Sequence, residues 1–160
     1  MNTDIYLTTA FAFMTCDGSI AEEEISLIRN MNAQGVFSVN DINNELEQLT
    51  TQLNAQGKDF MRSFLECVEQ TDLTVEQELK LLRIAVHTIY ADNVVEYSEV
   101  KFFRSLRIHL HHITDDYILE QIPEIEDFWL EADAKSSGAS VEKDYFDSIE
   151  FTSFDLKKLK

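Results

Sequence analysis

The sequence contains one proline and four glycines in 160 residues, so few residues interrupt regular secondary structure. No stretch before Pro123 alternates apolar and polar residues as a half-buried strand would. The apolar residues recur with a helical period instead. The sequence therefore predicts an all-α bundle of about seven helices, and the chain is long enough to form one domain with its own core.

Cysteine and long apolar runs are also scarce. The two cysteines, Cys16 and Cys67, show no paired spacing, which argues against a disulfide framework and favours a reducing, cytoplasmic location. The first residues carry no basic segment, so we expect no signal peptide. The apolar stretch 5–16 is far shorter than the roughly 20 residues that span a bilayer, so direct membrane insertion is not expected.

Positive charge is outweighed: 13 Lys and Arg residues stand against 30 Asp and Glu residues, for a formal net charge of −17. This field repels phosphate backbones and makes nucleic acid an unfavourable partner. It attracts cations and basic protein surfaces. We therefore expect a protein partner with a basic surface, and a homodimer is left open. Solubility alone is the simpler explanation of the charge.

Motifs of catalysis are missing as well. The sequence has no glycine-rich phosphate loop, no His-Glu-x-x-His and no nucleophile elbow. Asp17 follows Cys16, and its charge raises the pKa of the thiol, which makes the thiol a poorer nucleophile. We therefore expect that the protein is not an enzyme. A small hydrolase using Asp and Glu is the distant alternative, and it would need a pocket that raises one carboxyl pKa.

Start and stop signals divide the chain into its expected helices. Gly35 and Gly57 stand where two helices end, and Thr74 to Gln77 forms a capping box that starts another. The expected helices cover about residues 4–16, 21–35, 42–56, 58–70, 75–89 and 96–111, with a short one between Thr114 and Pro123.

One unit of sequence occurs twice. The stretch 16–24 (Cys-Asp-Gly-Ser-Ile-Ala-Glu-Glu-Glu) has a second copy at 91–99 (Ala-Asp-Asn-Val-Val-Glu-Tyr-Ser-Glu), 75 positions on. The aligned pairs include Asp17 with Asp92, Gly18 with Asn93, Glu24 with Glu99 and Met14 with Ile89. Gly and Asn both tolerate a positive φ, so the same tight turn suits both copies. The pattern indicates an internal duplication of helix, Asp-Gly-type turn and helix.

The two turns offer carboxylates to a hard cation such as Ca²⁺, Mg²⁺ or Mn²⁺, which binds several oxygen ligands. Each copy alone has too few oxygens, and neither has the pattern of an EF-hand loop. A site would need both copies to converge. Its ligands would be Asp17, Glu24, Asp92 and Glu99. In the alternative interpretation each Asp holds its own turn and each Glu stabilises the start of its own helix.

Histidines form a second candidate site. His109, His111 and His112 stand near the end of the sixth expected helix, beside two aspartates. His109 and His112 are three positions apart and would share a helix face, which suits Zn²⁺ or Ni²⁺. A histidine near a helix C-terminus is favourable by itself, and we prefer this explanation. His87, in the middle of the fifth expected helix, is expected to be a core residue.

The duplicated unit resembles the TerB-like family, named from tellurite-resistance proteins, whose domain also precedes some membrane-anchored DnaJ-type co-chaperones. The resemblance rests on the stretches 11–24 and 84–99 and covers roughly residues 1–121. It implies an all-α domain of about seven helices with a non-enzymatic role in metal or tellurite-type stress. It also implies that the four carboxylates of the two turns bind metal. The chain departs from the family where Ala21 and Glu96 replace the usual hydroxyl cap and Asn93 replaces Gly.

The chain after Pro123 lies outside the family pattern. We expect residues 1–122 to form the helical domain and residues 123–160 to form an acidic and aromatic extension, irregular or with a short β-strand. Its aromatic side chains carry too much apolar surface to be left in water, so at least half should contact the bundle or a second copy. These residues are Phe128, Trp129, Tyr145, Phe146, Phe151 and Phe154.

Overall fold

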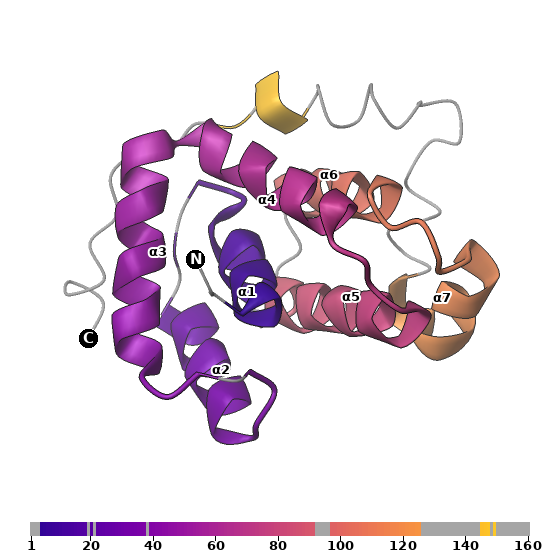
Figure 1. Cartoon of the computed structure of the whole chain (residues 1–160), viewed down its shortest axis with the longest axis horizontal. Helices are drawn as coiled ribbons and strands as arrows, with labels where there is room; N and C mark the ends of the chain where they lie inside the picture. Colours follow the sequence, from indigo (N-terminus) through magenta and orange to yellow (C-terminus); the bar gives the residue numbers. More distant parts are fainter. Residues whose placement is uncertain are drawn as a thin grey trace.

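The computed structural model describes residues 4–18, 20, 22–37, 39–91, 97–125, 145–147 and 149. Within these residues the secondary structure is entirely helical, which confirms the prediction of an all-α bundle (Figure 1). The elements are α1 (Ile5–Thr15), α2 (Glu22–Ala33), α3 (Ile42–Gln56), α4 (Lys58–Gln70), α5 (Val75–Ile89), α6 (Tyr97–Ile108), α7 (Asp115–Gln121) and the 3-10 helix η1 (Pro123–Ile125). None of the described helices is both long and apolar enough to cross a membrane.

The first helix, α1, lies at the centre of the molecule, with α2, α3, α4 and α5 around it (Figure 1). Every residue from Thr9 to Cys16 is buried. The helix begins at Asp4, whose carboxylate accepts hydrogen bonds from the N–H groups two and three residues on, at 2.7 and 3.4 Å. Thr9 and Thr15 donate their hydroxyls to carbonyls one turn back, so these polar groups are satisfied inside the core.

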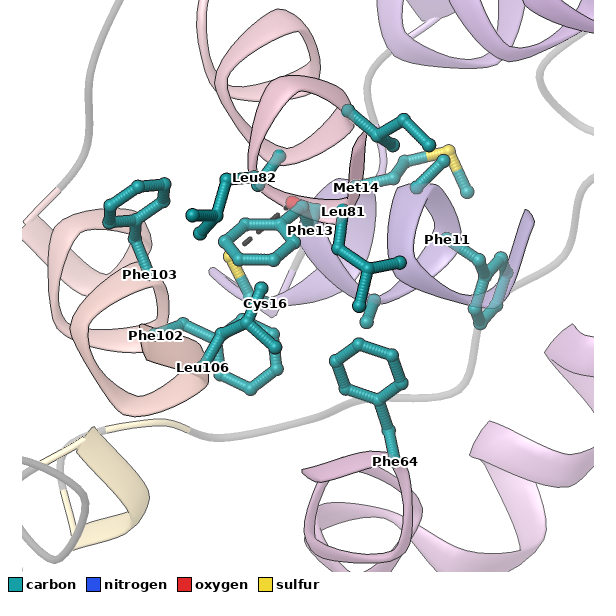
Figure 2. Close-up of a cluster of buried hydrophobic side chains, with 14 of the residues drawn as sticks. Phe11, Phe13, Met14, Cys16, Phe64, Leu81, Leu82, Phe102, Phe103 and Leu106 are labelled. Carbon is teal, nitrogen blue, oxygen red and sulfur yellow. Dashed lines mark hydrogen bonds between the residues drawn. The ribbon is translucent and has the colours of Figure 1, made fainter. Parts of the chain in front are cut away.

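Aromatic rings from three helices meet in the core. Phe102 of α6 has its ring centroid 4.9 Å from that of Phe13 in α1 and 6.1 Å from that of Phe64 in α4. Figure 2 shows these rings together with Leu81 and Leu82 of α5. Four helices from both halves of the chain therefore share one core.

The start and stop signals that the sequence analysis identified lie at the ends of helices in the structure. Thr74 starts α5, because its hydroxyl accepts from the N–H of Gln77 at 3.2 Å and the Gln77 side chain accepts from the N–H of Thr74 at 2.9 Å. Gly35 follows α2 with a φ of 84°, and Gly57 alone separates α3 from α4 with a φ of 57°. Both angles lie in the region that favours glycine.

Helix α6 ends at Ile108, although the sequence predicted a helix to residue 111. One local and one tertiary set of contacts holds the residues that follow. The Arg107 guanidinium donates to the carbonyl oxygens of Leu110 and Ile113, at 3.0 Å each. The buried carboxylate of Glu78, on α5, accepts hydrogen bonds from the backbone N–H groups of residues 111–113 at 2.8–3.2 Å. These contacts replace the last helical turn.

The duplicated halves share several features. Met14 and Ile89, at aligned positions, are both 0% exposed. The first turn contains Gly18 with a φ of 86°, and the N–H of Gly18 donates to the carbonyl of Thr15 at 2.9 Å. The second turn, residues 92–96, lies outside the described residues, so the likeness of the two turns stays a prediction.

Part of the C-terminal extension packs on the bundle. Residues 145–147 form one turn of helix, where the sequence left an irregular or short β structure open. Tyr145, Phe146 and Ile149 are buried, with exposed fractions of 0, 4 and 5%. The other aromatic residues named for the extension (Phe128, Trp129, Phe151 and Phe154) lie outside the described part, so the expectation for at least half of them is not tested.

Candidate functional site

The first acidic turn follows directly from the end of α1. Cys16 is fully buried and Asp17 is partly exposed. The Cys16 Sγ atom lies 3.3 Å from the carbonyl oxygen of Phe13, an interaction drawn as a dashed line in Figure 2. Because Gly18 adopts a positive φ, the chain turns sharply here toward α2. The turn therefore places Asp17 at the rim of the core rather than inside it.

Glu24 and Glu99 occupy equivalent positions in the two copies. Each is the third residue of its helix, α2 or α6. Their exposed fractions are 5 and 4%, although acidic residues in the first turn of a helix are usually solvated. A glutamate at this position can accept a hydrogen bond from the backbone N–H at the helix start, which is the structural alternative to ligand binding.

Charges from both copies act on one sulfur atom. Burial raises the pKa of the Cys16 thiol well above its usual value, and the carboxylates of Glu99, Asp17 and Glu24 raise this pKa further, in that order. Such effects weaken with distance, so carboxylates from the two copies lie near the same thiol. The pKa of Cys16 changes in the expected direction, with burial rather than Asp17 as its main cause.

The structure leaves the set of four ligands incomplete. Asp92 lies outside the described residues. Asp17, Glu24 and Glu99 each make further polar or electrostatic interactions. In the described part of the chain, no three His, Cys, Asp or Glu side chains are grouped so that they could hold a metal ion. A cation site therefore depends on what Asp92 adds.

The histidines are arranged differently from the sequence prediction. His109 Nδ1 lies 3.0 Å and His111 Nε2 3.6 Å from the same oxygen of Glu69, on α4. His112 Nδ1 lies 3.3 Å from Glu78 Oε2 instead. The prediction that His109 and His112 share a helix face is wrong, because α6 ends at Ile108, before either of them.

Glu78 is a polar residue that the sequence analysis missed. Its carboxylate is 3% exposed and holds the segment after α6 through three backbone N–H groups. The sequence contained a signal for the burial of Glu78. Leu79 and Leu82 mark the buried face of α5, and Glu78 lies next to that face. His87 was expected to be a core residue, and this prediction is wrong. It is exposed, on the same side of α5 as Arg83, four positions earlier.

Comparisons of this chain with protein-family models, with curated proteins and with solved structures found no match.

Proposed function

We propose that this protein is a non-enzymatic, TerB-like module that binds a divalent cation through its two acidic turns and acts in a metal or tellurite-type stress response. The observation that supports the proposal is the approach of Glu24 and Glu99, from the two copies, to one buried thiol, with Asp17 beside them. Asp92, the partner of Asp17 in the second copy, is the fourth proposed ligand.

The chemistry of these residues favours a hard cation. Carboxylate oxygens are the preferred ligands of Ca²⁺, Mg²⁺ and Mn²⁺. A soft metal such as Zn²⁺ would favour the thiolate of Cys16 as a ligand. Burial and the nearby carboxylates raise the pKa of that thiol, which disfavours the thiolate. The proposed ion is therefore one that binds oxygen alone.

The test is a set of thermal melts with Ca²⁺, Mg²⁺, Mn²⁺ or a chelator, at constant ionic strength. Wild type should gain about 2.7 kcal/mol of stability when the free ion reaches 100 times its dissociation constant. The double variant Glu24→Gln with Glu99→Gln should lose this gain. Glutamine still accepts a hydrogen bond at a helix start, as Gln77 does in α5, so the variant separates ligand binding from capping.

The matched control replaces two exposed helix glutamates, Glu47 and Glu66, by Gln, which changes the net charge equally. This control should keep the full gain, and Asp17→Asn with Asp92→Asn should abolish it. If wild type and the control gain no more from a divalent ion than from NaCl at equal ionic strength, the cation proposal is wrong.

The second candidate function is a metal-free acidic adaptor that recruits a protein with a basic surface. The net charge of −17 favours it, as do the exposed Glu22 and Glu23 beside the first turn. In this case Glu24 and Glu99 only stabilise their helices. The adaptor predicts no ion-specific stabilisation, and binding to its partner should weaken steeply with salt.

A further inference from the structure

The described part of the C-terminal extension packs against α1, α4 and α6, and the surface that it covers there is named the groove. Tyr145 contacts Phe102 of α6, with ring centroids 5.0 Å apart, and its hydroxyl donates to the carbonyl oxygen of Cys16 at 2.7 Å. Burial, above all, raises the pKa of this phenol. Phe146 and Ile149 are buried beside it. A short segment thus packs three apolar side chains and one hydroxyl against three helices that are far apart in the sequence.

Two basic residues of α4 recognise the same segment. The Lys58 ammonium donates a hydrogen bond to the backbone carbonyl of Phe146. The Arg62 guanidinium lies over the ring of Phe146, 4.4 Å from its centroid. In the sequence, Asp144 and Asp147 flank the two aromatic residues. Two basic groups in a strongly acidic chain therefore contact the backbone and an aromatic ring of this segment.

We propose that this groove is a peptide-binding site, and that the described segment with Tyr145, Phe146 and Ile149 is an internal ligand that competes with a segment of another protein. The external ligand has the same chemistry: two adjacent aromatic residues, an aliphatic residue three positions after the second, and acidic neighbours. This proposal is independent of the cation. It assigns the extension the role of an autoinhibitory segment.

The contacts are those of ligand recognition. The groove binds one backbone carbonyl, one hydroxyl and one ring face, all within a few consecutive residues, as a peptide site does. The segment is joined to η1 by the stretch 126–144, so it binds as an intramolecular ligand. A ligand that belongs to the same chain has a high effective concentration, which an external peptide must overcome.

The test uses the full-length chain with Tyr145→Ala and Phe146→Ala and a fluorescent peptide of residues 143–151. Anisotropy should show saturable binding to this variant at least about tenfold tighter than to wild type, whose own segment competes. The same peptide with both aromatic residues replaced by Ala should not bind. Circular dichroism verifies that the variant keeps its helical content.

Lys80 provides a matched control for the basic residues of the groove. Its ammonium donates to the carbonyl of Val36 at 2.9 Å and lies 3.9 Å from the centroid of the Tyr6 ring, which is the same chemistry at another place. Added to the double variant, Lys58→Met should weaken peptide binding several-fold. Lys80→Met should leave it unchanged. Equal effects of the two changes would overturn the assignment of the groove.

Two further results would overturn the proposal. One is a folded double variant that does not bind the peptide at about 1 mM. The other is a wild-type protein that forms a dimer by exchange of this segment, since a second copy would then be the occupant. If the double variant does not fold, a protease site inserted at residues 135–140 of wild type decides the question. After cleavage the fragment should exchange with labelled peptide, and a folded, cleaved protein without exchange would show that the segment is a fixed part of the core.

Discussion

At the scale of single residues, Tyr145 connects packing to proton binding. It is completely buried, and its hydroxyl has a backbone acceptor, the carbonyl of Cys16. The raised pKa means that the folded protein holds the phenolic proton more tightly than the unfolded chain does. The stability that this proton contributes is fully present below the unfolded pKa, about 10. It is lost as the pH rises above that value.

Replacement of Tyr145 by Phe should therefore have opposite effects in two pH ranges. At pH 7 the variant loses one hydrogen bond and about 1 kcal/mol of unfolding free energy. Above pH 10 Tyr145 costs the wild type up to about 1.36 kcal/mol per pH unit, a contribution that the variant lacks, so the difference closes and then reverses. Urea unfolding at pH 7, 9, 10.5 and 11 measures this.

The control for these unfolding measurements is Tyr6→Phe. Tyr6 is a half-buried residue of α1, and its ring lies beside Lys80. The pH profile of this variant shows the effect of the same Tyr→Phe change outside the contact with Cys16. A constant difference between wild type and Tyr145→Phe from pH 7 to 11 would contradict the prediction.

At the scale of helices, the sequence predicted a helix start or end correctly where neighbouring residues determine it. Gly35, Gly57 and the Thr74 capping box predicted their helix ends because a positive φ and a side-chain cap depend on a few neighbouring residues. The end of α6 depends on Glu78, more than 30 positions away, so local sequence could not give it. The candidate site divides in the same way. The repeat identified Glu24 and Glu99, but their burial depends on how two distant turns pack.

Two of the three described glycines with positive φ, Gly35 and Gly57, allow a prediction about backbone strain. A Cβ atom at Gly35 or Gly57 would meet no atom within 4 Å, so an Ala substitution at either position tests the backbone alone. Each substitution should lower the free energy of unfolding by about 1–2 kcal/mol, measured by urea unfolding. Gly57→Ala should be the more harmful, because its ψ of −129° also lies outside the left-handed helical region.

Asn tolerates the left-handed region, so Gly35→Asn should be less harmful than Gly35→Ala. The strain argument does not hold if both Ala variants are as stable as the wild type.

At the scale of the whole molecule, the net charge of −17 acts on every measurement of stability. Repulsion among the acidic groups disfavours the compact state, and salt screens it, since the Debye length falls from about 30 Å at 0.01 M to about 8 Å at 0.15 M. NaCl added over this range should raise the melting temperature by about 2–4 °C, which is about 1 kcal/mol for a chain of this size.

KCl should give the same increase as NaCl, because screening does not depend on the identity of a monovalent cation. This increase is the baseline against which any effect of a divalent ion is measured. A melting temperature independent of salt would mean that the acidic groups do not repel one another appreciably in the folded state.

The central position of α1 also has a consequence for synthesis. This helix leaves the ribosome well before α5, the helix with which it packs most extensively and which begins only at Val75. At 5–20 residues per second, α1 waits about 4–15 s before Val75–Ile89 has been made. During that time its apolar faces, buried on all sides in the finished protein, have no α5 to pack against. The nascent chain is therefore expected to need a chaperone on α1 until translation has passed Ile89.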